Sequence, residues 1–175
     1  MYVINLFGAP GAGKSTGATY IFSQLKMRGI NAEYVSEFPK DKVWEESKEA
    51  FKNQAYLFGN QYFRISRCKD KVDVIVTDSP LPLSLLYNQD VNLGEDFNKV
   101  VMKVFNSFNN LNYYINRTKP YNPKGRLQNE KESDELVSPL KNLLTINEIK
   151  YNEYNGELSD YNKIVEDIIN KINES

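Results

Sequence analysis

A glycine-rich segment near the N-terminus constrains this 175-residue chain more than any other feature. Residues 8–15 read Gly-Ala-Pro-Gly-Ala-Gly-Lys-Ser, which fits the pattern G-x-x-x-x-G-K-[ST]. The β-prone run Tyr2–Phe7 precedes the segment, and apolar residues at helical spacing follow it within Ser15–Arg28. A strand, a glycine loop and a helix in this order form a cradle for phosphates, because backbone N–H groups and the positive end of the helix face the same point.

The residue types in this loop predict separate tasks. Glycines accept positive φ angles and let the backbone come close to phosphate oxygens. Lys14 is expected to reach the β- and γ-phosphates of a nucleoside triphosphate, and the hydroxyl of Ser15 to bind Mg²⁺. The residues expected around the phosphates are Gly11, Ala12, Gly13, Lys14, Ser15 and Thr16.

The rest of the chain alternates between strand-like and helix-like segments. Further strands are expected at residues 32–35, 73–77, 112–115 and 150–154. Helices are expected over residues 42–52, 53–69, 83–87, 95–108, 131–146 and 160–172. This alternation predicts an α/β fold with a parallel sheet and helices on both faces. The length predicts one domain, residues 1–175.

Composition excludes several kinds of chemistry. The chain has no histidine and a single cysteine, Cys68, which excludes Ser–His–Asp and Cys–His nucleophiles, His-bound zinc and an internal disulfide. Lys and Arg number 22 against 23 Asp and Glu, and this balance argues against a protein that mainly grips long nucleic acid. No signal peptide or membrane-spanning run is expected, which predicts a cytoplasmic protein without a membrane partner.

Two carboxylates follow predicted strands, at positions that suit phosphoryl transfer. Asp78 follows the strand-like run 73–77, at a point where Mg²⁺ or its water shell is held, although it also fits the N-cap of a helix after Pro80. Glu37 follows the second predicted strand and can take the proton of an acceptor hydroxyl or bind the acceptor. Nearby carboxylates that compete with Glu37 for this role are Glu33, Asp41 and Glu45.

A polar loop with prolines and a glycine is expected at about residues 117–129. Its cations include Arg117 and Arg126, whose planar guanidinium groups offset the charge that develops on a transferred phosphoryl group. A lid that carries arginine also excludes water from the reaction. We therefore list Arg117 and Arg126 with Lys14, Glu37 and Asp78 as catalytic candidates.

One predicted helix carries a pattern that fits a ring-shaped acceptor. Gln54, Phe58 and Gln61 follow one another at i, i+4 and i+7, with Arg64 one turn further. Two amides with an aromatic ring between them suit the edge and face of a nucleobase or nicotinamide, but an ordinary amphipathic helix explains the pattern equally well. The acceptor-binding candidates are Glu37, Phe38, Gln54, Phe58, Gln61 and Arg64.

Taken together, these motifs resemble the small P-loop kinases. The resemblance rests on loop 8–16, Glu37, the run Asp78-Ser79-Pro80 and the segment Tyr-Asn-Pro-Lys-Gly-Arg at residues 121–126. It is strongest to AAA-type ATP-binding proteins common in phages, which are similar to nicotinamide ribonucleoside kinase domains. The resemblance implies a three-layer fold with strand order 2-3-1-4-5, ATP and Mg²⁺ as cofactors, and closure of Arg126 from the lid. Deoxynucleoside kinases usually carry D-R-[ST] after the third strand, and that arginine is missing here.

The leading hypothesis is an ATP- and Mg²⁺-dependent kinase that phosphorylates a hydroxyl of a nucleoside-like or nucleotide-like acceptor. The first alternative is a kinase acting on DNA, at a 5-hydroxymethyluracil base or a strand end. It predicts a basic strip beside the acceptor cleft, formed by Arg64, Arg67, Lys69 and Lys71. The second alternative is a regulatory ATPase module that uses Asn88–Asp96 as an interaction loop. The sequence identifies neither the acceptor nor the oligomeric state.

Overall fold

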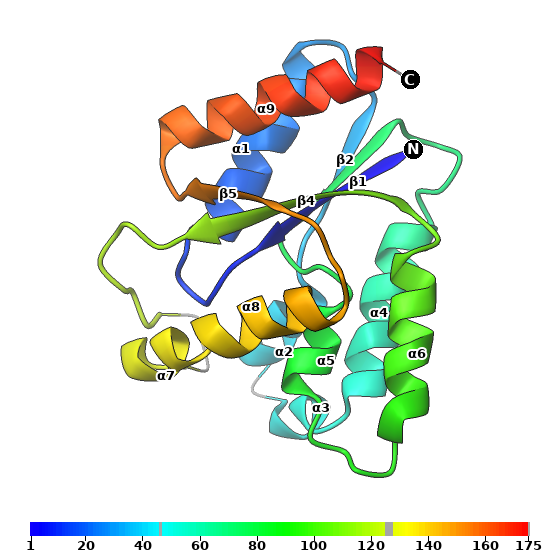
Figure 1. The fold of residues 1–175 in the computed structure, drawn as a ribbon, viewed down its shortest axis with the longest axis vertical. Coiled ribbons are helices and arrows are strands. Elements are labelled where there is room, and N and C mark those ends of the chain that lie inside the picture. The colour runs from blue at the N-terminus through cyan, green and yellow to red at the C-terminus, as the bar shows by residue number, and fades with distance from the viewer. Residues whose placement is uncertain (46, 125–127, 175) are drawn as a thin grey trace.

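A parallel sheet of five strands forms the centre of the molecule in the computed structural model, which describes residues 1–45, 47–124 and 128–174 (Figure 1). The strands are β1 (Tyr2–Phe7), β2 (Ala32–Val35), β3 (Val74–Thr77), β4 (Asn109–Asn116) and β5 (Asn152–Asn155). Their order is β2-β3-β1-β4-β5, and every neighbouring pair is parallel. The predicted α/β class, the parallel sheet and the strand order are confirmed.

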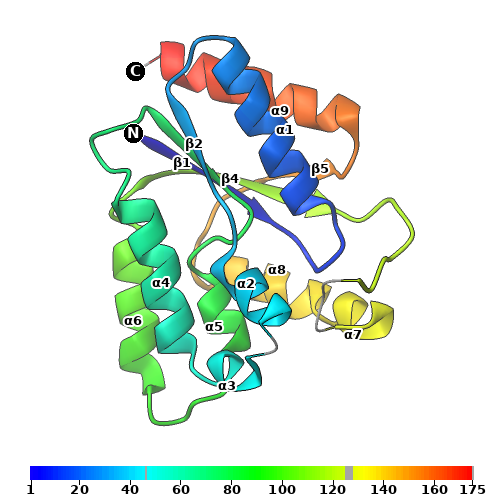
Figure 2. The ribbon, with the colours of Figure 1, turned by 180° about the vertical axis from the view of Figure 1, so that it is seen from behind.

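Helices cover both faces of this sheet, as Figures 1 and 2 show from opposite sides. The helices α1 (Lys14–Met27) and α9 (Leu158–Asn173) pack together on one face. The helices on the other side are α2 (Phe38–Trp44), α3 (Lys48–Phe51), α4 (Gln54–Ser66), α5 (Leu83–Tyr87), α6 (Gly94–Phe105), α7 (Glu130–Glu135) and α8 (Val137–Ile146). No helix in the described part of the chain is long and apolar enough to cross a membrane.

The central strand β1 serves two separate cores because side chains alternate along it. Ile4 and Leu6 belong to the core under α1 and α9. Val3 and Phe7 belong to the core on the opposite face, with residues of α4, α6 and α8. These four side chains are almost completely buried. Strand β1 is therefore enclosed on both sides, as expected for a central strand of a parallel sheet.

The prediction of one helix over residues 42–52 was wrong, because the first helix starts earlier and the segment is divided between two helices. Helix α2 already begins at Phe38, with Glu37 as its N-cap and Pro39 in its first turn. A proline fits there because the first-turn N–H groups have no partner within the helix. A separate short helix, α3, follows from Lys48.

Two other boundaries also differ from the prediction. The helix expected over residues 131–146 is divided into α7 and α8 near Leu136, because Pro139 has no N–H to bond back to the preceding turn. Strand β4 begins at Asn109 rather than at residue 112. Its first residues pair with Tyr2, Val3 and Ile4 of β1, so pairing in the sheet overrides the low strand propensity of asparagine.

The strand order brings three loops to one edge of the sheet. The glycine loop follows β1, and β1 lies between β3 and β4. Asp78 directly follows β3, and Arg117 directly follows β4. Because the carboxyl ends of parallel strands share an edge, these residues lie on the same side of the sheet as the glycine loop.

Candidate active site

The glycine loop has the backbone geometry of a phosphate cradle. Gly13 has a φ of 100° at the start of α1, in the region that favours glycine. A β-carbon on Gly8 would lie 2.5 Å from the carbonyl oxygen of Ile115, so that position also requires glycine. Lys14 Nζ donates hydrogen bonds to the carbonyl oxygens of Gly8 (2.8 Å) and Ala9 (3.1 Å). These bonds hold Lys14 over the glycine loop, where it is expected to reach the phosphates.

Two buried side chains from distant parts of the chain donate hydrogen bonds to the backbone of the glycine loop. Tyr161 of α9 is 3% exposed, and its hydroxyl donates to the carbonyl oxygen of Gly13 at 3.0 Å. Ser133 of α7 is fully buried, and its hydroxyl donates to the carbonyl oxygen of Pro10 at 2.7 Å. Sequence reasoning missed both residues, because neither belongs to a motif. The only local signal was Gly17 inside α1, where the ring of Tyr161 packs.

Asp78 occupies a buried position at the end of β3, with 2% of its surface exposed. It lines the same cavity as Lys14 and Ser15. Burial, followed by the charge of Asp78 and a hydrogen bond with it, raises the pKa of Tyr34 well above its ordinary value. The Oδ1 atom of Asp78 is buried and has no hydrogen-bond partner among the described residues. The alternative N-cap role is wrong, because α5 begins at Leu83 and has Pro82 as its N-cap.

The second carboxylate, Glu37, lines the cavity at the start of α2. Burial and the charge of Glu37 both raise the pKa of Tyr87, on α5. Burial and Asp78 are the larger causes of the raised pKa of Tyr34, to which the charge of Glu37 also contributes. Glu37 is therefore one of the carboxylates that line the cavity. The competing carboxylates Glu33, Asp41 and Glu45 are not among the described lining residues.

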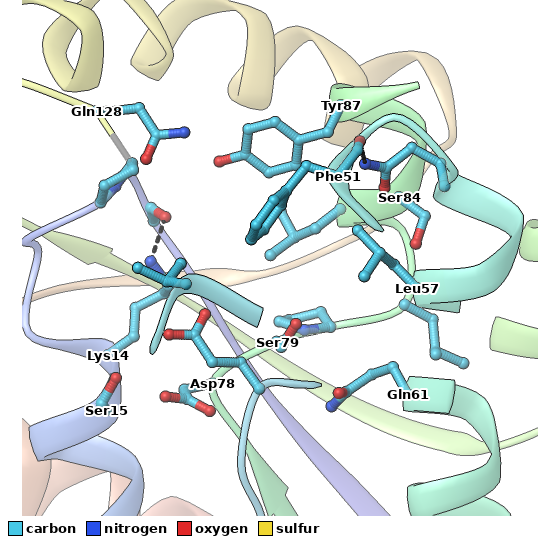
Figure 3. Close-up of a pocket in the computed structure, with 18 of the residues that line it drawn as sticks. Lys14, Ser15, Phe51, Leu57, Gln61, Asp78, Ser79, Ser84, Tyr87 and Gln128 are labelled. Carbon is cyan, nitrogen blue, oxygen red and sulfur yellow. Dashed lines mark hydrogen bonds between the residues drawn. The ribbon is translucent and has the colours of Figure 1, made fainter. Parts of the chain in front are cut away.

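A single cavity of about 710 Å³ extends from the glycine loop to helices α3, α4 and α5. In Figure 3, Lys14, Ser15 and Asp78 lie on one side of it, and Phe51, Leu57 and Tyr87 on the other. We call the first side the phosphate end and the second the acceptor end. Further lining residues at the acceptor end are Gln54, Gln61, Leu83, Ser84, Gln89 and Asp90. Of the acceptor end, sequence reasoning found only the glutamines and Glu37.

The acceptor candidates on α4 divide between the cavity and the core. Gln54 and Gln61 line the cavity, whereas the ring of Phe58 packs edge-to-face on Phe97 of α6, 5.7 Å between centroids. The reason is helical geometry: Leu57 and Phe58 are separated by about 100° on the helix, so they flank the line of the two glutamines on opposite sides. Leu57 takes the cavity side instead.

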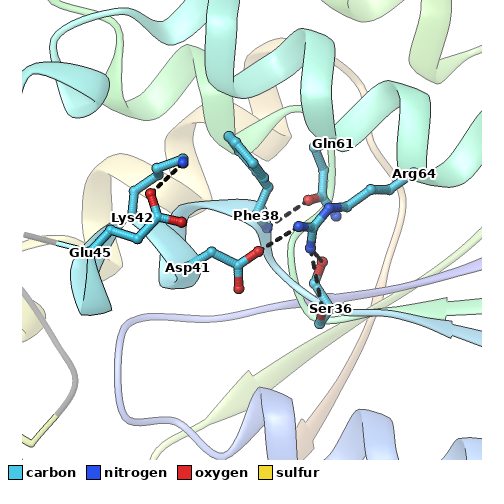
Figure 4. Close-up of polar contacts among 7 residues, drawn as sticks. All are labelled: Ser36, Phe38, Asp41, Lys42, Glu45, Gln61 and Arg64. Carbon is cyan, nitrogen blue, oxygen red and sulfur yellow. Dashed lines mark hydrogen bonds and ion pairs between the residues drawn. The ribbon is translucent and has the colours of Figure 1, made fainter. Parts of the chain in front are cut away.

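Phe38 and Arg64 form a polar cluster beside the cavity rather than part of its lining (Figure 4). Gln61 Oε1 accepts from the backbone N–H of Phe38 at 2.9 Å. Arg64 lies over the Phe38 ring and donates to Asp41 at 2.5 Å, while Lys42 pairs with Glu45. These contacts fix the loop that presents Glu37.

Of the two arginines expected in the lid, the structure describes only Arg117. Arg117 is held by Asp134 (2.5 Å) and Glu130 (3.4 Å) of α7, and its guanidinium lies over the ring of Tyr121. Its Nη1 atom is buried and has no hydrogen-bond partner among the described residues. Arg117 does not line the cavity in this arrangement. Arg126 lies outside the described residues, so its expected closure stays a prediction.

The basic residues Arg67, Lys69 and Lys71 follow the end of α4 and do not lie beside the cavity. They precede β3, at the amino ends of the strands, whereas the cavity lies at the carboxyl ends. Helix α4 begins at the cavity with Gln54, and its 13 residues span about 20 Å. Three of the four residues expected beside the cleft of a DNA kinase are therefore on the far side, whereas the fourth, Arg64, lies beside the cavity and is paired with Asp41.

A magnesium ion fits the phosphate end. The described residues contain no cluster of three or more carboxylates or cysteines that could hold a metal alone. Mg²⁺ instead favours one or two protein oxygens together with waters and phosphate oxygens. The hydroxyl of Ser15 and the unpartnered Oδ1 of Asp78 line this end and match that requirement.

Comparison with models of known protein families and with curated protein sequences finds no match for this chain. The assignment of a function therefore rests on the residues and geometry of the cavity.

Proposed function

We propose that the protein is an ATP- and Mg²⁺-dependent kinase that transfers the γ-phosphoryl group to a hydroxyl of a nucleoside-like or nucleotide-like acceptor. One observation carries the proposal: the glycine loop opens into a cavity whose other end is lined by aromatic, aliphatic and amide side chains. An enzyme that only hydrolyses ATP needs room for a water molecule. A kinase needs an enclosed second site of this kind, next to the γ-phosphate.

The proposed transfer assigns a task to each described residue at the phosphate end. The acceptor oxygen bonds to the γ-phosphorus, the bond from that phosphorus to the β–γ bridging oxygen breaks, and ADP leaves. Lys14 orients the γ-phosphoryl group, while Ser15 and Asp78 hold Mg²⁺, which neutralises charge on the phosphates. Glu37, a carboxylate that lines the cavity, takes the proton of the acceptor hydroxyl.

A regulatory ATPase module is supported less well. That alternative assigned the segment Asn88–Asp96 to a partner protein, yet Gln89 and Asp90 of this segment line the cavity. A DNA kinase also has less support than expected, because Arg67, Lys69 and Lys71 of its basic strip lie away from the cleft and only Arg64 lies beside it. Neither alternative explains the ring-lined acceptor end.

The proposal is tested by incubating the protein with Mg²⁺-ATP and a panel of nucleosides, nucleotides and oligonucleotides, and by following phosphate transfer by mass. We expect an acceptor-dependent product. The variant Lys14→Ala should lose transfer and ATP binding while its circular dichroism spectrum is unchanged. Lys26→Ala is the matched control, because Lys26 lies exposed at the other end of α1.

Two results would refute the kinase assignment. One is transfer activity that survives in Lys14→Ala. The other is ATP consumption that no member of the panel changes, which would favour the regulatory module instead.

A further inference from the structure

We infer that Gln61 is a positioning residue that joins the turns carrying Glu37 and Asp78 through hydrogen bonds to the residues beside these carboxylates. The sequence pattern makes the same amide a candidate for binding the acceptor. The inference rests on the proposed kinase function, because Glu37 and Asp78 have the tasks that this function assigns to them. It goes beyond that function by naming what holds the two carboxylates relative to each other.

The two carboxylates follow neighbouring strands of the sheet. Strands β2 and β3 pair in parallel, with Val35 opposite Thr77. Asp78 directly follows β3, and Glu37 comes two residues after β2, so both turns leave the sheet at the same edge. Both carboxylates line the cavity. A side chain that bonds to both turns therefore fixes one carboxylate relative to the other.

Gln61 makes one hydrogen bond to each turn. Its Oε1 accepts from the backbone N–H of Phe38, the residue after Glu37, at 2.9 Å (Figure 4). Its Nε2 donates to Oγ1 of Thr77, the residue before Asp78, at 3.3 Å. Gln61 is 4% exposed and Thr77 is fully buried, so water competes little for these bonds. An amide suits this place because it carries both an acceptor and a donor, unlike a carboxylate or an ammonium group.

Each turn also has a hydrogen bond of its own. The hydroxyl of Thr77 accepts from the backbone N–H of Ser79 at 3.2 Å, which closes the turn around Asp78. On the other turn, Arg64 of α4 donates to the carbonyl oxygen of Ser36 at 3.4 Å (Figure 4). Because hydrogen bonds in a connected network strengthen one another, we expect the loss of one bond to weaken the others.

Amide exchange in the ligand-free protein tests the link separately from catalysis. Thr77→Val removes the hydroxyl at nearly constant volume, whereas the amide of Phe38 bonds to Gln61. We expect this variant to speed hydrogen exchange of the Phe38 amide several-fold, measured by NMR, because the effect passes through Gln61. Thr77→Ser keeps the hydroxyl and should leave this exchange rate close to that of the natural protein.

Magnesium dependence tests whether the link serves the phosphate end. Calorimetry measures the binding of a non-hydrolysable ATP analogue with Mg²⁺ and with a chelator. In Gln61→Met we expect the gain in affinity from Mg²⁺ to fall about fivefold, the effect of roughly one hydrogen bond, while the metal-free affinity is unchanged. A general loss of structure would lower both affinities.

Two further variants complete this experiment. Asn60→Leu is the matched control, because the amide of Asn60 donates to the carbonyl oxygen of Tyr56 on the same helix. The double variant Gln61→Met/Thr77→Val should lose no more of the Mg²⁺ effect than either single variant, since both changes break the same link. Circular dichroism checks that each variant is folded, and the pair Thr77→Val and Thr77→Ser repeats the measurement if Gln61→Met does not fold.

The outcomes separate the two proposals. If the ATP analogue does not bind the natural protein, the kinase function fails, and amide exchange still tests the link. If the analogue binds but Gln61→Met keeps the full effect of Mg²⁺, the positioning role is overturned while the nucleotide site stands. Unchanged exchange of the Phe38 amide in Thr77→Val, or additive losses in the double variant, would also overturn it.

Discussion

The close contact between Gly17 and Tyr161 gives a sharp test of how the glycine loop is supported. Gly17 is buried in α1, and a β-carbon placed on it would lie 2.3 Å from Cε1 and 2.8 Å from Cζ of the Tyr161 ring. That ring is itself buried and is fixed at its far end by the hydrogen bond to Gly13. The substitution Gly17→Ala therefore forces the ring away from the loop.

The expected magnitude follows from three effects, two of which destabilise the protein and one of which stabilises it. Overpacking a buried site costs about 1–3 kcal/mol. Alanine regains about 1 kcal/mol over glycine inside a helix. Loss of the hydrogen bond from Tyr161 to Gly13 adds about 1 kcal/mol. We expect Gly17→Ala to lower the free energy of unfolding by about 1–3 kcal/mol, which at roughly 2–4 °C per kcal/mol lowers the Tm by several degrees.

A second helical glycine supplies the control. Gly59 lies exposed in α4, and a β-carbon there would meet no atom within 4 Å. Gly59→Ala should raise the free energy of unfolding by about 0.5–1 kcal/mol, because only helix propensity changes. Urea unfolding and thermal melting measure both variants, and binding of an ATP analogue should weaken in Gly17→Ala alone. If Gly17→Ala proves as stable as Gly59→Ala, the packing argument is refuted.

Further predictions concern the same support. Tyr161→Phe should cost about 1 kcal/mol and weaken binding of an ATP analogue, because the carbonyl oxygen of Gly13 loses one of its two donors and keeps only the backbone N–H of Gly17. Tyr20→Phe, which removes an exposed hydroxyl bonded to α9, should leave that binding unchanged; equal effects of the two variants would contradict the role of Tyr161. The hydrogen bond from Lys163, with one from a backbone N–H of β5, lowers the pKa of Asp160, so its carboxylate stabilises the fold at neutral pH and this contribution disappears as the pH falls below about 4. Asp160→Asn should therefore be less stable than the natural protein at pH 7 but equal to it near pH 2, and a difference that persists at pH 2 would show another cause.

The sequence pattern was enough to predict the elements that depend only on residues close together along the chain. The glycine loop requires particular residue types at fixed spacing, so Lys14, Ser15 and the glycines were recognised directly. The alternation of strands and helices predicted the parallel sheet, which is confirmed. Boundaries failed where a neighbouring element decided them, as at Asn109, which pairs with Tyr2 of β1.

The acceptor end shows a different limit. The spacing of Gln54, Phe58 and Gln61 correctly placed them on one face of a helix, but only part of that face borders the cavity. Whether a residue on it meets solvent, a ligand or another helix depends on what packs beside it, and α6 took Phe58 into the core.

The amino-acid sequence alone was therefore sufficient for the class of fold, the glycine loop and the two carboxylates that follow β2 and β3, because each depends on neighbours along the chain. Tertiary structure was needed to find Tyr161 and Ser133, which form hydrogen bonds to the glycine loop and lie more than a hundred residues away from it in sequence. It was also needed to find the pairing of Arg64 with Asp41 beside the cavity, since that pairing depends on distance in space. Contacts of this kind leave no periodic signal, because they join segments whose separation along the chain is arbitrary.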